Sequence, residues 1–455
     1  MSEKGRLFGT DGVRGRANVH PMTAEMALSL GQAIAHVFRG EGGDRTRIII
    51  GKDTRLSGYL FEDALAAGIS CMGVDVIQVG PMPTAGMAFL TADMRCRAGV
   101  MISASHNAYQ DNGIKFFSND GFKLPDEVED RIEQLIESGA LAEQRAEPDA
   151  IGRARRIDDA EGRYVVFLKK TFPRDLALDG LRVVLDCAHG AAYKVGPTVL
   201  QELGAELFTL GVDPDGRNIN RECGSLYPEK TAAKVRELRA DVGIALDGDA
   251  DRCVLVSEKG EIVDGDALIA LLARDLLGRG GLTGGKVVGT VMSNLGLEKA
   301  LEKLGVGLLR TQVGDRYVVD AMRAGGYSLG GEPSGHIIFL DHNTTGDGLI
   351  TALQTLAIMR RSERGLAELT ADFERFPQVL LNVAVAEKRP LESLSSVAEA
   401  VRRVDAELDG RGRVLIRYSG TESKARVMVE GDDEQRVGEY ARDIADQLKR
   451  ELAGA

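Results

Sequence analysis

Three features are scarce in this sequence, and each scarcity excludes a class of protein. No apolar run approaches the length of a membrane-spanning helix, so we expect no membrane anchor. The first residues, Met-Ser-Glu-Lys-Gly-Arg, lack the apolar segment of a secretory signal peptide. The five cysteines show neither paired nor metal-ligand spacing, which is typical of reduced thiols in the cytosol. We therefore expect a soluble cytoplasmic protein.

Positively charged residues are fewer than negatively charged ones. The chain holds 57 lysine and arginine residues against 69 aspartate and glutamate residues, a formal net charge of −12. Such a surface repels nucleic acid and anionic lipid unless basic side chains collect in one cleft, so we expect neither as a partner. The hydrophobic content of 44% is ordinary for a globular protein, and 455 residues are enough for about three or four domains.

Three segments share one plan. Each begins with a short apolar strand, continues through a polar turn and a helix-like run, and reaches a second strand after a glycine; they span 47–80, 182–211 and 286–314. This order is typical of βαβ units in parallel sheets, and the segments lie too far apart for a solenoid. We predict three related α/β domains. The 55 glycines fit the many tight turns that such domains need.

The C-terminal part follows a different plan. We expect a strand at 379–385, a helix at 391–408, a strand pair at 413–418 and 426–430, and a helix at 432–452. This pattern indicates a small α+β domain appended to a larger body.

Boundaries between these units are marked by changes of pattern. An amphipathic helix at 126–136, stopped by Gly139, precedes a polar stretch at 143–156 that we interpret as a linker. A hairpin at 253–263 leads out of the second unit, and a further boundary is expected near 373–377. The predicted domains are 1–155, 156–256, 257–373 and 374–455.

The apolar run 98–102 ends in a loop rich in reactive side chains. It contains Ser105 and His106, and Lys115 follows. A polar turn is the bland interpretation; acyl transfer is disfavoured because no Gly-x-Ser-x-Gly elbow surrounds Ser105. Lys115 is a candidate phosphate clamp, or a general base if its pKa is depressed. His106 is more typical of a residue that orients the loop than of a catalyst.

The strongest local signal is the acidic loop Ala-Leu-Asp247-Gly-Asp249-Ala-Asp251-Arg252. Three carboxylates at alternate positions after an apolar strand repel one another unless a cation lies among them. A calcium EF-hand is excluded because Arg252 stands where its glycine is required. The Asp-x-Asp of haloacid dehalogenases usually has Thr or Val where Asp251 stands. So few oxygen ligands on one short loop favour Mg²⁺ over a solvated acidic turn.

Three further loops suit anions or sugars. The glycine-rich turn Gly9–Gly15 presents Arg14, whose planar fork matches phosphate. In 330–337, Glu332 and Ser334 are suited to sugar hydroxyls, and His336 to proton transfer or phosphate binding. In the last domain, an anion cradle is predicted from Arg417, Ser419, Gly420 and Thr421.

Taken in order, these five loops resemble the α-D-phosphohexomutase superfamily over essentially the whole chain. The Gly9–Gly15, Ser-Ala-Ser-His-Asn, Gly-Glu-Pro-Ser-Gly-His and Arg-Tyr-Ser-Gly-Thr forms are most similar to its bacterial members that interconvert glucosamine 6-phosphate and glucosamine 1-phosphate, on the route to UDP-N-acetylglucosamine and the cell wall. The resemblance implies three similar α/β domains with mixed or parallel sheets and a C-terminal α+β domain, arranged around a central cleft.

The resemblance also implies roles for individual residues. Ser105 carries the phosphoryl group and, with the three aspartates, binds one Mg²⁺ per chain; a sugar 1,6-bisphosphate is the intermediate and activator. Proton transfer, charge stabilisation and contact with the phosphoserine are implied for Arg14, Lys115, Arg252 and His336. Substrate binding is implied for Glu332, Ser334, Arg417, Ser419, Gly420 and Thr421. The metal ligands that the resemblance implies are Ser105, Asp247, Asp249 and Asp251.

Two departures and several alternatives stand beside this interpretation. Ala108 stands where the family often has proline, and residues 423–425 stand where the family has a more apolar turn. Both departures affect the expected stiffness of these loops. The alternatives are a phosphomannomutase or phosphoglucomutase, a magnesium phosphatase built on Asp247 and Asp249, and a sugar-phosphate sensor without turnover. The expected partner is a small sugar phosphate. A homodimer is also among the expected partners, although no residue pattern in the sequence predicts the oligomeric state.

Overall fold

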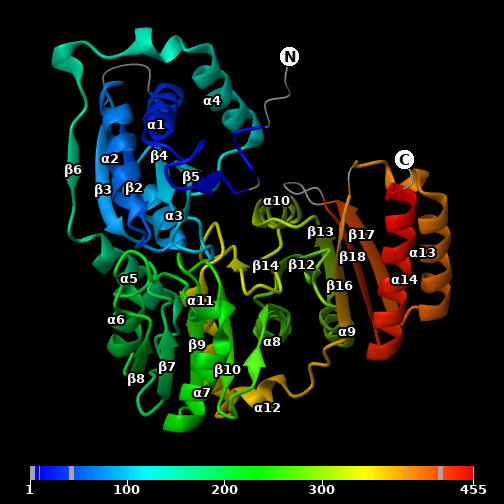
Figure 1. The fold of residues 1–455 in the computed structure, drawn as a ribbon. Helices are drawn as coiled ribbons and strands as arrows, with labels where there is room; N and C mark the ends of the chain where they lie inside the picture. Colours follow the sequence, from blue (N-terminus) through cyan, green and yellow to red (C-terminus); the bar gives the residue numbers. More distant parts are fainter. Residues whose placement is uncertain (1–5, 10, 40–45, 386, 419–423, 454–455) are drawn as a thin grey trace.

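The computed structural model describes residues 6–9, 11–39, 46–385, 387–418 and 424–453. Within them the chain forms four β-sheets in succession along the sequence, each with its own helices (Figure 1). The first three units are α/β and the last is α+β, so the predicted fold class is confirmed.

The first sheet has six strands in the order β1-β5-β4-β2-β3-β6. Strands β2, β3, β4 and β6 are parallel, whereas β5 runs antiparallel to both β4 and β1. Helices α1 and α2 pack on each other, and α3 contacts β2 and β4. The elements are β1 (Val13–Arg16), α1 (Ala24–Phe38), β2 (Arg47–Lys52), α2 (Ser57–Ser70), β3 (Asp75–Pro81), α3 (Thr84–Asp93), β4 (Ala98–Ile102), β5 (Asp111–Ser118), α4 (Asp126–Ser138), η1 (Ala140–Gln144), η2 (Pro148–Ala150) and β6 (Ala154–Arg156).

The second sheet has the order β11-β10-β9-β7-β8. Its βαβ core is parallel, and the expected hairpin is present as β10 and β11, which pair antiparallel. The elements are α5 (Ala160–Thr171), β7 (Arg182–Asp186), α6 (Val195–Glu202), β8 (Glu206–Leu210), η3 (Gly224–Leu226), α7 (Pro228–Leu238), β9 (Val242–Leu246), β10 (Cys253–Ser257) and β11 (Ile262–Val263).

The third sheet has the order β13-β12-β14-β15 and is again mixed. Its helix α11 begins at the N-cap Asp347, whose carboxylate accepts hydrogen bonds from two backbone N–H groups of the first turn. The elements are α8 (Gly265–Gly278), η4 (Thr283–Gly285), β12 (Lys286–Thr290), α9 (Leu295–Lys303), β13 (Gly307–Thr311), α10 (Asp315–Gly325), β14 (Leu329–Gly331), β15 (Ile337–Phe339), α11 (Gly348–Ser362) and α12 (Leu366–Thr370).

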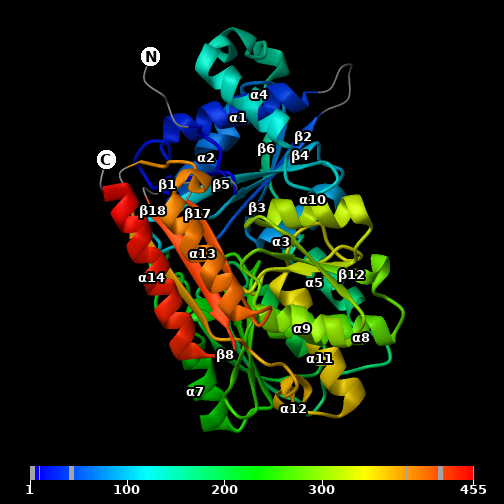
Figure 2. The ribbon, with the colours of Figure 1, turned by 90° about the vertical axis from the view of Figure 1, so that its right-hand side faces the viewer.

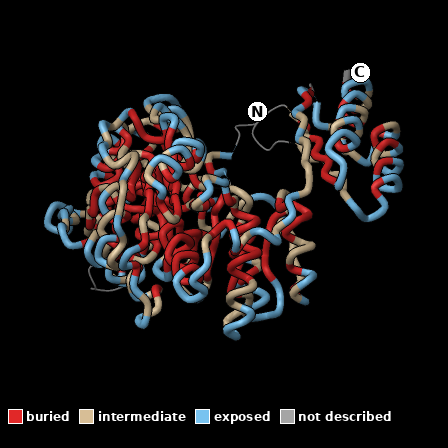
Figure 3. Tube along the Cα trace, turned by 90° about the horizontal axis from the view of Figure 1, so that it is seen from below, coloured by how far each residue is buried: buried red, intermediate tan, exposed pale blue. Residues whose placement is uncertain are grey.

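The C-terminal unit is an antiparallel sheet of order β16-β18-β17, with two helices packed against it (Figures 1 and 2). It has a hydrophobic core of its own, whereas one continuous core extends through parts of the other three units. Figure 3 shows it as a lobe set apart from the main body. The elements are β16 (Gln378–Ala384), η5 (Leu391–Ser393), α13 (Ser395–Leu408), β17 (Gly412–Tyr418), β18 (Lys424–Gly431) and α14 (Glu434–Ala453).

The structure corrects two of the expected boundaries. The stretch 143–156 is not simply a linker, because its end forms β6, which adds to the first sheet beside β3. All three residues of β6 are exposed, so the strand lacks the apolar alternation that would reveal it. The limit at 256 separates the paired strands β10 and β11, which both belong to the second sheet.

No helix within the described ranges combines the length and the apolar character needed to cross a bilayer.

Candidate active site

Ser105 lies in the loop that follows β4. Its side chain is buried, and its φ of 51° is in the left-handed region that non-glycine residues seldom enter. Ser105 Oγ donates a hydrogen bond of 2.6 Å to Asp247 Oδ2 and lies 3.4 Å from His106 Nδ1. The serine of the first unit therefore touches the acidic loop of the second unit directly.

A buried arginine that the sequence analysis left without a role holds the backbone of this loop. Arg55 is fully buried, and its guanidinium donates to four backbone carbonyl oxygens. The acceptors are the carbonyl oxygens of Ser105 (2.9 Å), Asn107 (2.8 Å), Ala108 and Asp111 (3.0 Å). One side chain thus fixes the main chain on both sides of the serine, including at Ala108, where loop stiffness was in question.

Two further residues complete this support. Asp53 accepts hydrogen bonds from Arg55 Nε at 2.8 Å and from Ser103 Oγ at 2.7 Å. From the second unit, Asn220 Nδ2 donates to the carbonyl oxygens of Ser105 and Asn107 at 2.9 and 3.0 Å. The available signal was the charged run Lys-Asp-Thr-Arg at 52–55, which begins with the last residue of β2 and lies at the same end of the sheet as the serine loop.

Glycine at 248 allows the two loops to meet. A Cβ at this position would lie 2.6 Å from the carbonyl oxygen of Ser105 and 2.7 Å from Asn220 Nδ2. Because both neighbours are fixed by hydrogen bonds, a side chain at 248 would push the serine loop away from the aspartates.

The three aspartates follow β9 and are all buried. Each has a carboxylate oxygen within 4.8 Å of the others. Asp249 Oδ2 accepts hydrogen bonds from Thr84 Oγ1 at 2.6 Å and from Lys115 Nζ at 3.0 Å. Burial and the charges of Asp251 and Asp249 raise the pKa of Asp247 well above its ordinary value.

These residues fit a divalent cation. Asp249 Oδ1 and Asp251 Oδ1 are buried without a hydrogen-bond partner, so each has an unused acceptor. Three carboxylates this close together repel one another when ionised, and a bound hard cation that takes oxygen ligands neutralises that repulsion. The donor set is all oxygen, which suits Mg²⁺ rather than a softer metal.

Lys115 lies on β5 and is buried among carboxylates. Its Nζ lies 3.0 Å from Asp249 Oδ2, 3.2 Å from Asp11 Oδ2 and 3.8 Å from Asp251 Oδ2. Burial lowers the pKa of Lys115, but the three carboxylates outweigh it and raise the pKa above its ordinary value. The condition for Lys115 to act as a general base, a depressed pKa, is not met, and the three carboxylates favour its charged ammonium form.

The two histidines have opposite electrostatic surroundings. Burial, Arg252 and Arg14 lower the pKa of His106 to about 4, so its ring is neutral. Burial also lowers the pKa of His336, but Asp251, Asp315 and Glu332 outweigh it and raise the value to about 9. His336 Nδ1 lies 3.5 Å from Asp251 Oδ2, which links the third unit to the acidic loop.

Two predicted arginines lie at the edge of the same cluster. Arg14, on β1, forms an ion pair with Asp11, and its Nε is buried without a partner. Arg252 follows the aspartates, and its Nε, also without a hydrogen-bond partner, lies 3.9 Å from Asp251 Oδ1. Unused N–H donors beside a cation site are suited to the oxygens of a phosphate.

The predicted sugar loop follows β14. Glu332 Oε1 accepts a hydrogen bond of 3.2 Å from the backbone N–H of Gly314, and Ser334 Oγ is buried without a partner. Glu332 also contributes to the electrostatic environment of Arg252 and His336, so this loop faces the cluster.

The predicted anion cradle is only partly described. Arg417 is on β17, directly opposite Arg426 of β18, and its Nε lacks a partner. Burial and the charge of Arg426 lower the pKa of Arg417, so an anion bound there would be stabilised. The other three predicted cradle residues, Ser419, Gly420 and Thr421, lie outside the described residues. Within the described chain no hydrogen bond or ion pair joins Arg417 to the Ser105 cluster.

The arrangement brings a buried hydroxyl, three carboxylates that fit a cation and several charged N–H donors together at the meeting point of three units. Such a set can hold a phosphoryl group on Ser105 and neutralise charge that develops during its transfer.

Comparison with known proteins assigns all four units to one family pattern. The models for phosphoglucomutase/phosphomannomutase alpha/beta/alpha domains I, II and III match residues 5–143, 163–260 and 264–376, and the C-terminal domain model matches 380–447. A phosphoglucosamine mutase from Anaeromyxobacter sp. (strain Fw109-5) is 61% identical over 451 residues, covering 98% of this chain and 96% of that protein.

Solved structures show the same fold. A phosphoglucomutase/phosphomannomutase family protein from Burkholderia thailandensis superposes with a TM-score of 0.82 at 25% identity, covering 99% of this chain and 98% of its own. An N-acetylphosphoglucosamine mutase from Aspergillus fumigatus, solved with GlcNAc-6P and magnesium, superposes with a TM-score of 0.66 at 18% identity, covering 98% and 96%.

Proposed function

The chain belongs to the phosphoglucomutase/phosphomannomutase family, and on that premise we propose that it interconverts glucosamine 6-phosphate and glucosamine 1-phosphate, with Ser105 as the phosphoryl carrier. One observation carries the proposal: the Ser105 hydroxyl is buried and hydrogen-bonded to Asp247, within a site that three units of the chain build together. The similarity to phosphoglucosamine mutases extends over nearly the whole chain, which supports the choice of an amino-sugar phosphate.

Ser105 suits a carrier that must give a phosphoryl group and take it back. In the first half-reaction the bond between Oγ and phosphorus breaks, and the phosphorus bonds to a free hydroxyl oxygen of the sugar monophosphate. In the second half-reaction the other phosphoryl group of the resulting sugar bisphosphate returns to Oγ. The sugar hydroxyl that attacks phosphorus loses a proton in the first step, and the sugar oxygen released in the second step gains one, so the two steps together are an isomerisation.

The aspartates and Ser105 would hold one Mg²⁺ ion. When bound, this ion supplies charge neutralisation at the phosphoryl oxygens and holds them in position. Crowded carboxylates and two unused acceptors support this assignment.

The cationic side chains stabilise negative charge in this scheme. Lys115 and His336 have raised pKa values, which favours their charged forms. Arg14 and Arg252 add guanidinium groups from the first and second units. Because phosphoryl transfer depends mainly on positioning and electrostatics, cations contributed by several units suit this reaction.

Glu332 and Ser334 would read the sugar hydroxyls, and Arg417 with Ser419, Gly420 and Thr421 would hold the phosphate that is not being transferred. An anion site on the separate C-terminal lobe can serve both orientations of the sugar, provided that Glu332 meets similar hydroxyls in each. A catalytic amount of sugar 1,6-bisphosphate would activate the enzyme by phosphorylating Ser105 and leaving as the monophosphate.

Intact-mass measurement together with turnover tests the carrier. The wild-type protein should show a phosphorylated fraction that Ser105→Ala abolishes along with activity. Ser118→Ala, at the far end of β5, is the matched control and should keep both. A fully active Ser105→Ala variant would refute the proposal.

Comparison of kcat/KM for the 6-phosphates of glucosamine, glucose and mannose tests the substrate. We expect glucosamine 6-phosphate to be preferred. A preference for either other sugar would reassign the chain within the family. Net release of inorganic phosphate would instead support the phosphatase alternative.

A further inference from the structure

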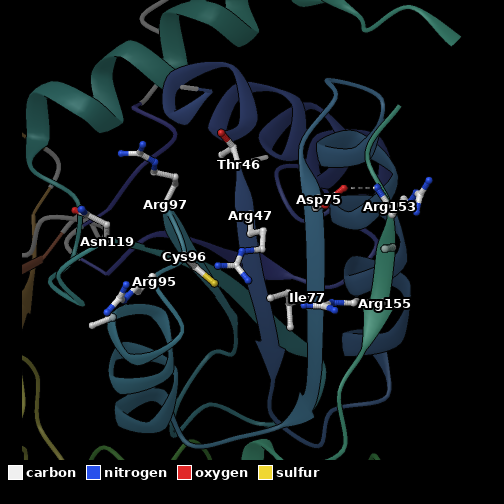
Figure 4. Close-up of a pocket in the computed structure, with 12 residues that line it drawn as sticks. Thr46, Arg47, Asp75, Ile77, Arg95, Cys96, Arg97, Asn119, Arg153 and Arg155 are labelled. Carbon is white, nitrogen blue, oxygen red and sulfur yellow. Dashed lines mark hydrogen bonds between the residues drawn. The ribbon is translucent and has the colours of Figure 1, made fainter. Parts of the chain in front are cut away.

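A second concave site lies on the first unit. It is at the end of the sheet where β2 and β3 begin, opposite to the end that carries the Ser105 loop. Its volume is about 930 Å³. The strands β2 and β3 begin at its rim, and β6 forms one side, whereas the serine loop follows the carboxyl end of β4. The lining residues are Thr46, Arg47, Asp75, Ile77, Ala92, Arg95, Cys96, Arg97, Asn119, Arg153, Ala154 and Arg155 (Figure 4). No residue of this set belongs to the site described above.

The cavity is basic although the whole chain is acidic. The lining includes the guanidinium groups of four arginines, Arg47, Arg95, Arg97 and Arg155, that face the cavity, and only one carboxylate. The whole chain, in contrast, has a net charge of −12. Within the described residues none of the four forms an ion pair. The carboxylate, Asp75, accepts a hydrogen bond of 2.8 Å from the backbone N–H of Arg153, so it is already engaged. Arg95, Arg97 and Arg155 are exposed, so solvent screens their mutual repulsion and their guanidinium groups are open to an anion from solution.

The guanidinium groups come from separate segments. In Figure 4, Arg155 extends from β6 across Ile77 towards Arg47 of β2, while Arg95 and Arg97 lie on the turn before β4. Burial raises the pKa of the Cys96 thiol to about 11, and the charges of Arg47 and Arg155 act against that rise. Both arginines are thus close to the same buried thiol, which is neutral and forms part of the floor.

We propose that this cavity binds a small organic anion that carries two or more phosphate groups. Arginine forks match phosphate oxygens in pairs, and forks that come from β2, β6 and the turn before β4 offer contacts to more than one phosphate group. The volume is within the range of small-molecule sites, and the lining offers no aromatic ring to stack on a base. Recognition therefore rests on the phosphates rather than on the organic part. The proposal uses no catalytic residue, so it stands or falls independently of the proposed mutase activity.

Calorimetric titration of the full-length protein with inorganic pyrophosphate, in magnesium-free buffer at low salt, tests this site. The test variant is Arg95→Gln/Arg155→Gln, which removes one fork from each side of the cavity. We expect it to lose about tenfold or more in affinity for one binding event, because charge-assisted contacts are removed on two sides. Arg417→Gln, which changes the predicted phosphate cradle of the C-terminal lobe, should retain that event.

Arg153→Gln is the matched control. Arg153 lies at the same rim, but Figure 4 shows its side chain directed away from the cavity, so pyrophosphate binding should be unchanged. Equal loss in Arg153→Gln and in the double variant would overturn the proposal in favour of a diffuse charge effect. An unchanged isotherm in the double variant, with the unfolding midpoint of the wild type, would also overturn it. Tighter binding of a short single-stranded oligonucleotide than of pyrophosphate would assign the surface to an extended phosphate backbone instead.

Discussion

Replacement of Arg55 by lysine is expected to lower kcat without a matching change in KM. Arg55 touches no side chain proposed to contact the substrate, but its guanidinium donates to four backbone carbonyl oxygens of the loop that carries Ser105, that of Ser105 included. A lysine ammonium has three donors on one atom and cannot reach both sides of the loop. The substitution keeps the positive charge beside Asp53, so it isolates the loss of geometry from the loss of charge.

The magnitude follows from the hydrogen bonds that are lost. At least two of the four charge-assisted hydrogen bonds would be lost, and each contributes about 1.5–3 kcal/mol. Asn220 still donates to the carbonyl oxygens of Ser105 and Asn107, so the loop is loosened rather than released. A penalty of this size favours a relaxed loop in which Ser105 leaves its left-handed conformation. A displacement of about 1 Å in a reacting group lowers the rate by roughly a hundredfold. We therefore expect kcat to fall by about two orders of magnitude.

Steady-state kinetics and hydrogen exchange of the loop amides provide the assay. Arg182→Lys is a suitable control, because Arg182 also donates to backbone carbonyl oxygens, those of Leu238 and Arg239, but lies in the second unit away from the cluster. The control should lose some stability and keep its kcat. The reasoning fails if Arg55→Lys keeps wild-type kcat, or if its loop amides stay as protected as in the wild type.

Three further predictions test the cation, the cradle and a buried carboxyl. Removal of Mg²⁺ should abolish turnover. Addition of Mg²⁺ at about a hundred times its Kd should stabilise the folded wild type by about 2.7 kcal/mol and should not stabilise Asp251→Asn. Equal shifts of the thermal unfolding midpoint in the two proteins would argue against the site. Arg417→Gln should raise KM about tenfold or more with a smaller effect on kcat, because it removes a charge-assisted contact to the phosphate that is not transferred; a fall in kcat alone would contradict this role. Burial raises the pKa of Asp266 to about 7, so the folded protein favours the protonated carboxyl and loses stability as pH rises from the unfolded value through 7. Asp266→Asn cannot ionise, and its stability advantage over the wild type should grow by roughly 2–3 kcal/mol between pH 5 and 8 in thermal unfolding, whereas a constant difference would exclude the shift.

Much of the fold could be predicted because local patterns determine it. The apolar strands 98–102 and 182–186 appear with the predicted limits, and the helix after 126 ends at Gly139 in the left-handed conformation. Apolar periodicity and helix stops act over a few residues, so they are visible in the sequence. Strand β6 was missed because an exposed three-residue strand is defined only by its partner β3.

The candidate site divides in the same way. The alternating aspartates indicated a cation site by themselves, because like charges on neighbouring residues repel wherever the chain folds. The resemblance of the five loops to one family supplied Ser105 and the remaining roles. The electrostatic state of Lys115 was not accessible, because it depends on Asp11 and on aspartates more than a hundred residues away in sequence.

The sequence by itself determined the α/β units, the appended α+β domain, the acidic loop and, through resemblance, the type of chemistry. Only the tertiary structure decided that Arg55 and Asn220 hold the Ser105 backbone, that Lys115 lies among carboxylates that favour its charged form, and that four arginines share a cavity at the opposite end of the first sheet. The physical reason is the separation along the chain of the residues that interact. Periodicity and like-charge repulsion act between near neighbours in the chain, whereas burial, ion pairing and hydrogen-bond partners depend on which distant segments the sheets bring together.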